Sequence, residues 1–176
     1  MNSLKIENLI EQARRTYLIC EPHLKKSLME LVEETRKAVE KSRLISKNLG
    51  ISEICRRCEE EEEGGSCCGA GIEYCYTEPL LIANFLAGAT LPSSRFNEKS
   101  CYFLGPKGCE LLFRHTLCVN FLCKTLYDKL GTEQIVLIQA TIGDEIDLTF
   151  KLCEAISRII RNDPKNYDRQ RYGKNS

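Results

Sequence analysis

Apolar residues at helical spacing dominate the first 50 positions of the chain. They recur every three or four residues over 4–17, which predicts an amphipathic helix that ends at 21–22, because proline disfavours a helical residue before it. A second pattern of the same kind runs over 22–48, and Gly50 is well placed to end it. The pattern therefore predicts a helical hairpin over residues 1–54.

Helical periodicity returns after Cys123. It predicts a short helix that Gly131 stops, a helix over 133–141 capped by Thr132, and a break or kink at 143–144 before a last helix. The last helix spans 145–160, and one face of it is predicted to carry Ile146, Phe150, Cys153, Ile156 and Ile160. The polar, aperiodic segment 162–176 is predicted to be a flexible tail.

The middle of the chain, residues 55–123, has little periodicity apart from one apolar helix. Thr77 can cap this helix, Pro79 suits its first turn and Gly88 can close it. Its apolar stretch is too short for the ~20 residues that cross a bilayer, so we expect a buried helix.

These patterns together predict a mostly α fold in a single domain over residues 1–161. Its parts are the helical hairpin (1–54), an irregular cysteine-rich centre stapled by metal (55–123) and C-terminal helices (124–161).

The charge balance and the N-terminal sequence exclude some classes of function. The 25 basic and 25 acidic side chains cancel, and no Lys/Arg stripe alternates with aromatic residues, which argues against nucleic-acid binding. Glu7 and Glu11 interrupt the N-terminal apolar run, so it is not a secretory signal and we expect a cytoplasmic protein without a membrane partner. Cysteines at short spacings in such a protein more often ligate metal or do redox chemistry than form structural disulfides.

The cysteines are concentrated in the centre of the chain. Nine of the 11 lie at positions 55, 58, 67, 68, 75, 101, 109, 118 and 123. Cys55 and Cys58 form a C-x2-C pair, and soft thiolates select zinc or iron–sulfur centres over hard cations.

The spacing of the later cysteines adds two expectations. A tight turn at 105–108 would bring Cys101 and Cys109 together. Cys118 and Cys123 are about 140° apart around an ideal helix, so they either serve different metals or flank an irregular turn.

The order of these motifs resembles the YkgJ-type cysteine-cluster family, described as zinc- or iron-chelating domains. The resemblance covers about residues 55–123 and includes Phe103-Leu104, Gly108-Cys109, Arg114 and Phe121. It implies eight metal ligands: Cys55, Cys58, Cys67, Cys68, Cys101, Cys109, Cys118 and Cys123. The chain departs from the family at Tyr102 and His115, where proline is usual, and at Val119, where arginine is common.

Three functions are compatible with such a centre. The first is a metal-binding protein that holds zinc or an iron–sulfur cluster, and the charge of the two kinds of centre does not discriminate them. The second is an iron–sulfur enzyme, since some longer relatives in the family are described as flagellin lysine methylases, although the chain has no Gly-rich nucleotide loop. The third is an adaptor that zinc stabilises and that binds a protein partner.

The remaining candidates have two or more interpretations each. His115 is a possible nitrogen ligand or a residue outside the ligand set, and Arg114 either pairs with a sulfur or a bound anion or lies on a helix surface. Cys75 is a spare ligand, a core residue or a redox-active thiol, whereas Cys20 and Cys153 are predicted core thiols. The glutamate run 59–63 is predicted to be a solvated spacer, because neighbouring side chains point apart and cannot converge on one ion.

Overall fold

The computed structural model describes residues 3–61 and 68–162. Within these ranges, the side chains of residues 3–4, 56 and 58–61 are not described. The predicted tail from residue 163 on lies outside the described residues, and so do the side chains of the predicted glutamate spacer. In the described part, helices dominate and the only sheet is a pair of two-residue strands, which confirms the predicted mostly α fold.

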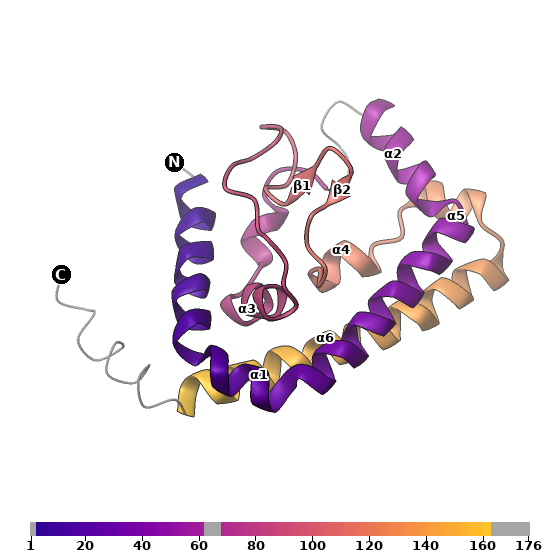
Figure 1. The fold of residues 1–176 in the computed structure, drawn as a ribbon. Helices are drawn as coiled ribbons and strands as arrows, with labels where there is room; N and C mark the ends of the chain where they lie inside the picture. Colours follow the sequence, from indigo (N-terminus) through magenta and orange to yellow (C-terminus); the bar gives the residue numbers. More distant parts are fainter. Residues whose placement is uncertain (1–2, 62–67, 163–176) are drawn as a thin grey trace.

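The N-terminal part of the chain is one long helix, α1 (Ser3–Asn48), with Pro22 inside it. The predicted helical hairpin is therefore wrong. Proline removes one backbone hydrogen bond and crowds the preceding turn, at a cost of ~3 kcal/mol, and it typically kinks a helix rather than ending it when both sides are packed. Figure 1 shows α1 bending once, so that its two arms diverge. Gly50 follows α1 with φ +70°, as predicted for the residue that ends it.

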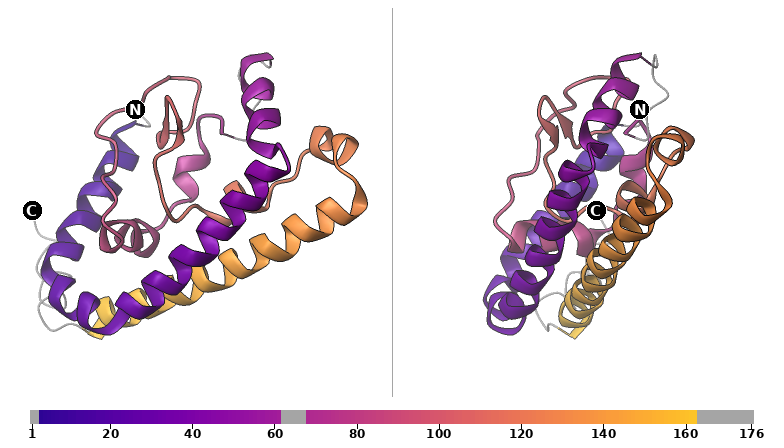
Figure 2. Two further views of the ribbon diagram at one scale, coloured as in Figure 1. Left: turned by 45° about the vertical axis from the view of Figure 1, so that its right-hand side comes forward. Right: turned by 90° about the vertical axis from the view of Figure 1, so that its right-hand side faces the viewer.

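The last described element is also one long helix, α6 (Thr132–Asn162). The predicted break at Gly143 is wrong, because glycine in a helix interior costs only ~1 kcal/mol and packing against α1 offsets it. Figures 1 and 2 show α6 running beside the second arm of α1. The Ser42 hydroxyl joins the two helices by donating to the Glu145 carboxylate, and Lys41 Nζ lies 3.2 Å from Asp144 Oδ2.

The cysteine-rich centre lies between the arms of α1 (Figure 1). It includes α2 (Ile51–Glu61), a 3-10 turn η1 (Ile72–Cys75) and α3 (Glu78–Leu86). Thr77 precedes α3, and Gly88 follows it with φ +81°, as predicted. Residues 80–86 of α3 are all buried, which confirms the predicted buried helix.

The rest of the centre is a short hairpin followed by two short helices. Strands β1 (Leu104–Gly105) and β2 (Gly108–Cys109) pair antiparallel. Helices α4 (Thr116–Asn120) and α5 (Lys124–Lys129) follow. The chain is extended at Phe121, between them, so α5 is a new helix and Cys118 and Cys123 flank an irregular turn, one of the two predicted alternatives.

The main core joins α1, α3, the hairpin and the C-terminal part of α6. Cys20 is fully buried, and Cys153 is half-buried against this core, as predicted for core thiols. Phe150 was predicted on the buried face of the last helix, but it is 64% exposed. Ile156 and Ile160 are buried as predicted, and Ile146 and Cys153 are half-buried. The other buried residues of α6 after Gly143 are Glu145 and Leu152. Among the described helices, none is long and apolar enough to span a membrane.

Candidate metal site

Backbone hydrogen bonds align the segment 68–70 with the segment 99–101 that precedes the hairpin. The Cys101 amide donates to the Cys68 carbonyl at 2.6 Å, and the Ala70 amide donates to the Lys99 carbonyl at 3.0 Å. Gly69 and Ser100 form an isolated antiparallel bridge between these two bonds. The segment that carries Cys68 therefore lies directly beside the segment that carries Cys101.

The β1–β2 hairpin then brings Cys109 back toward Cys101. Leu104 pairs with Cys109 in the ladder, and the Leu104 amide donates to the Cys101 carbonyl at 3.0 Å. Gly108 has φ +108°, a conformation that favours glycine, and it permits the tight reversal. The predicted turn at 105–108 is confirmed, and the two thiols are close enough to interact electrostatically.

Tyr76 connects this pair of thiols to Cys118. Its side chain is 4% exposed, and its ring packs against Phe103 with the ring centroids 4.7 Å apart. The Tyr76 hydroxyl lies 3.7 Å from Cys118 Sγ and accepts a 3.1 Å hydrogen bond from the His115 amide. Burial raises the pKa of Tyr76, and the charges of Cys109 and Cys118 raise it further. The phenol is therefore a neutral hydrogen-bonding group at the meeting point of three chain segments.

The environment keeps the thiols protonated. Burial raises the pKa of Cys101 to about 12, and the neighbouring Glu73, Cys109 and Cys118 add to this shift. Burial also raises the pKa of Cys109, although Arg114 and Arg43 oppose the shift. At neutral pH these side chains are thiols rather than thiolates, so binding of a metal would have to release protons.

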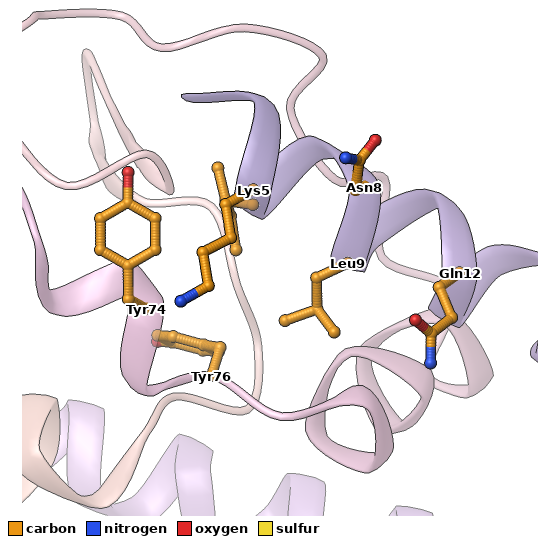
Figure 3. Close-up of a pocket in the computed structure, with 7 residues that line it drawn as sticks. Lys5, Asn8, Leu9, Gln12, Tyr74 and Tyr76 are labelled. Atoms are coloured by element: carbon orange, nitrogen blue, oxygen red, sulfur yellow. The ribbon is translucent and has the colours of Figure 1, made fainter. Parts of the chain in front are cut away.

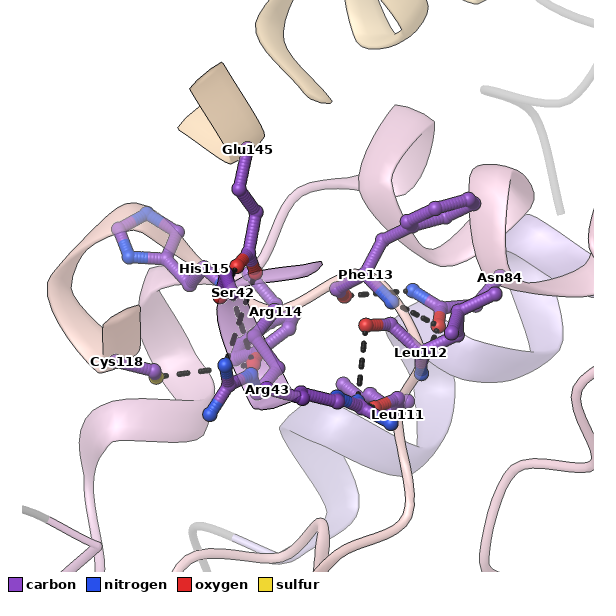
Figure 4. Close-up of polar contacts among 11 residues, drawn as sticks. Ser42, Arg43, Asn84, Leu111, Leu112, Phe113, Arg114, His115, Cys118 and Glu145 are labelled. Carbon is purple, nitrogen blue, oxygen red and sulfur yellow. Dashed lines mark hydrogen bonds and ion pairs between the residues drawn. The ribbon is translucent and has the colours of Figure 1, made fainter. Parts of the chain in front are cut away.

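Two arginines, Arg43 and Arg114, lie at the chain segment that follows Cys109 (Figure 4). Arg43, on the second arm of α1, donates from Nη2 to the carbonyls of Leu111 and Leu112, at 2.7 and 3.1 Å. Arg114 Nη2 lies 3.7 Å from Glu145 Oε1 on α6. The segment after Cys109 is thus tied to both long helices.

The buried carboxylate in this group has incomplete hydrogen bonding. Glu145 is 1% exposed and accepts from the Ser42 hydroxyl, but its Oε1 and the Nε of Arg114 have no hydrogen-bond partner. With Arg43 nearby, two cations face one carboxylate in a region of reduced dielectric. Arg114 and Arg43 favour the thiolate form of Cys109, whereas burial and Glu110 disfavour it.

Asn84 fixes the chain between Cys109 and Cys118. It is fully buried on α3 and donates from Nδ2 to the carbonyls of Leu80 and Phe113, both at 2.9 Å. Its Oδ1 accepts from the amides of Leu112 and Phe113, at 2.9 and 3.0 Å. All four hydrogen-bonding positions of the amide are occupied, so the path of this segment is specified by one side chain.

Sequence analysis did not single out Tyr76, Asn84 or Arg43. The one available signal was Asn84, a polar residue inside an apolar helix, where a buried amide needs partners. Nothing in the sequence connects Arg43 with a segment 68 residues later, because that contact depends on the path of α1.

The predicted ligands are distributed as follows. The charges of Cys109 and Cys118 act on Cys101, and Cys68 lies on the segment beside Cys101. Cys55 is on α2 and Cys123 is the residue before α5. The side chains of Cys58 and Cys67 lie outside the described residues. Among the described side chains, no three His, Cys, Asp or Glu residues come together closely enough to hold a metal ion, so the eight-cysteine set stays a prediction.

The other candidates have clearer positions. His115 caps α4, and its Nδ1 accepts a 3.2 Å hydrogen bond from the Leu117 amide, which leaves only Nε2 for any ligand. Arg114 forms its ion pair with Glu145 and lowers the pKa of Cys109 against the effect of burial, so its pairing with a sulfur stays a prediction. Cys75 is exposed, which rules out a core role.

In comparisons with known proteins, no family model, no curated protein and no solved structure matches the chain. The resemblance to the cysteine-cluster family therefore stays a prediction from the motif order.

Proposed function

We propose that the chain is a metal-binding protein of the YkgJ-type cysteine-cluster family, which chelates zinc or an iron–sulfur cluster through its eight motif cysteines. The observation that carries this proposal is that the Tyr76 hydroxyl lies 3.7 Å from Cys118 Sγ, while the charges of Cys109 and Cys118 both act on Cys101. These three thiols come from different segments, and a fourth motif residue, Cys68, is hydrogen-bonded through its backbone to the same region. Thiol ligands select zinc and iron–sulfur centres over hard cations.

Electrostatics supports the same proposal. A centre ligated by four thiolates carries a formal net charge near −2, whether it is zinc or an oxidised cubane. Arg114 and Arg43 place positive charge near Cys109, and Glu145, Glu110 and Glu40 offset part of it. Such charge compensation by residues outside the ligand set stabilises bound thiolate centres and tunes their properties.

A second candidate is the zinc-stabilised adaptor for a protein partner. Large apolar side chains flank Cys118 in the sequence: Leu117 is 53% exposed and Phe121 is 55% exposed. Exposed apolar side chains of this kind can contact a protein partner. The iron–sulfur enzyme related to flagellin lysine methylases stays a prediction.

Anaerobic purification followed by metal analysis and a visible absorption spectrum distinguishes these functions. Brown protein that contains iron and labile sulfide would exclude the zinc adaptor. Colourless protein with two zinc ions per chain would exclude the iron–sulfur enzyme and an electron carrier. Protein that contains neither metal after growth in supplemented medium would contradict metal binding altogether.

A pair of variants tests the ligand set. Cys109→Ser should lower the metal content, because serine is a poor ligand for soft metals. Cys153→Ser is the matched control, since Cys153 is half-buried in the core and is not a motif cysteine. Equal metal content in the two variants would remove Cys109 from the ligand set.

A further inference from the structure

A pocket of about 300 Å³ lies between the start of α1 and the segment that carries Tyr74 and Tyr76. Figure 3 shows its lining residues: Lys5, Asn8, Leu9 and Gln12 come from α1, and the two tyrosines form the opposite wall. Its volume is at the lower end of the range of small-molecule sites, about 300 to 1,000 Å³. A ligand with a single ring therefore fits better than a nucleotide or a larger cofactor.

The wall formed by the tyrosines is rigid. The Tyr74 amide donates to the Gly71 carbonyl at 3.1 Å and the Tyr76 amide donates to the Glu73 carbonyl at 3.2 Å, which fixes η1. Glu73 is itself buried and ion-paired with Arg95. Tyr74, on this fixed turn, offers an aromatic surface to a ligand at little cost in conformational entropy, while the 4% exposed Tyr76 closes the base of the wall.

The positive charge of Lys5 favours an anionic ligand in this pocket. Lys5 is the only charged residue among the described residues that line the pocket. Its ammonium lies 5.9 Å from the centre of the Tyr74 ring, and Figure 3 shows it reaching into the gap between the tyrosines. Lys5 is in the first turn of α1, where the helix dipole also favours a negative group.

At the Gln12 end of the pocket, the carboxylate of Glu78 already accepts hydrogen bonds from neighbouring residues. Glu78 accepts hydrogen bonds from Gln12 Nε2 at 2.9 Å and from the Thr16 hydroxyl at 2.6 Å. Gln12 is seven residues from Lys5, about 10 Å along the helix. An anion bound at Lys5 is therefore well separated from this carboxylate.

From these observations we propose that the pocket binds a small aromatic carboxylate. The acid group pairs with Lys5 and the ring packs against Leu9 and the tyrosines. Tyr76 is shared with the cysteine site through its hydroxyl, which contacts Cys118 and the His115 amide. A ligand that contacts Tyr76 is therefore expected to shift the NMR resonance of the His115 amide, which donates to the Tyr76 hydroxyl.

The test is a titration of the ¹⁵N-labelled chain, as purified, with sodium phenylacetate, followed by ¹H–¹⁵N NMR. The expected result is a set of saturating shifts at the amides of Leu9, Tyr74, Tyr76 and His115. Lys5→Gln should weaken binding about fivefold, the worth of an exposed ion pair. Lys26→Gln, which removes an exposed lysine elsewhere on α1, should leave the affinity unchanged.

Two further measurements keep the proposal falsifiable. Leu9→Trp fills the pocket and should abolish binding; should that variant fail to fold, Lys5→Gln alone decides, because Lys5 is exposed. Phenylacetamide, the neutral analogue, should bind more weakly than phenylacetate. Absence of saturable shifts, shifts away from the lining residues, or equal affinity for the amide would overturn the proposal.

Discussion

Asn84 shows how much of this fold depends on a single buried side chain. Apolar neighbours fill the rest of α3, so the amide has no access to water, yet each of its donors and acceptors has a protein partner. Its partners belong to the segment between Cys109 and Cys118. The geometry of the candidate metal site is consequently linked to the core of the domain.

Asn84→Ala should lower the free energy of unfolding by about 2 to 4 kcal/mol, because the amides of Leu112 and Phe113 lose their acceptor inside the core. Urea denaturation measures this loss. Asn97→Ala is the control, since Asn97 makes an exposed bond to the Lys99 amide and its loss should cost less than about 1 kcal/mol. Similar losses for both variants would contradict the role given to Asn84.

The Cys153 thiol should make the free energy of unfolding depend on pH, and this effect does not involve a metal ligand. Burial raises its pKa from 9.0 to about 12 in the folded chain. Above pH 9 the unfolded chain loses the thiol proton first, so the unfolded state is favoured and stability falls as the pH rises. The fall is at most about 1.4 kcal/mol per pH unit.

Urea denaturation of the wild-type chain and of Cys153→Ala at pH 8, 9 and 10 isolates this effect, because all other titrating groups are common to both proteins. The advantage of the wild-type chain over the variant should shrink as the pH rises from 9 to 10. A constant difference across this range would show that the Cys153 thiol is not shielded from ionisation.

At the scale of elements, the long helices were only partly predictable. The periodicity located the buried positions of α1, such as Leu24, Leu28 and Val32, and these are buried in the structure. It failed at Pro22 and Gly143, where local propensity favours an end to the helix. Both helices continue because α1 and α6 pack along each other, and such long-range packing is not visible in a local pattern.

Two glycines give a matched test of these backbone arguments. Gly143→Ala should raise the free energy of unfolding by about 0.5 to 1 kcal/mol, since Gly143 lies inside α6 and an added Cβ meets no atom. Gly88→Ala should lower it by about 1 kcal/mol, because Gly88 has φ +81° although the space around it is equally open. Thermal unfolding of both variants measures the signs, and a destabilising Gly143→Ala would indicate strain in α6.

At the scale of the whole molecule, the bent α1 holds the cysteine-rich centre between its arms, and α6 supports the second arm (Figure 2). The sequence predicted the helical class, the apolar α3 and the turn between Cys101 and Cys109. It could not predict that Arg43 of α1 and Glu145 of α6 would meet the segment after Cys109. Those contacts depend on how three distant parts of the chain assemble, and spacing within each part carries no information about them.

The central claim is that sulfur atoms of this chain bind metal, and X-ray absorption at the metal edge of the purified protein tests it most directly. The account predicts a first shell dominated by sulfur, at about 2.3 Å if the metal is zinc, and a smaller sulfur contribution in Cys109→Ser than in Cys153→Ser. A first shell of only nitrogen or oxygen at about 2.0 to 2.2 Å would contradict it.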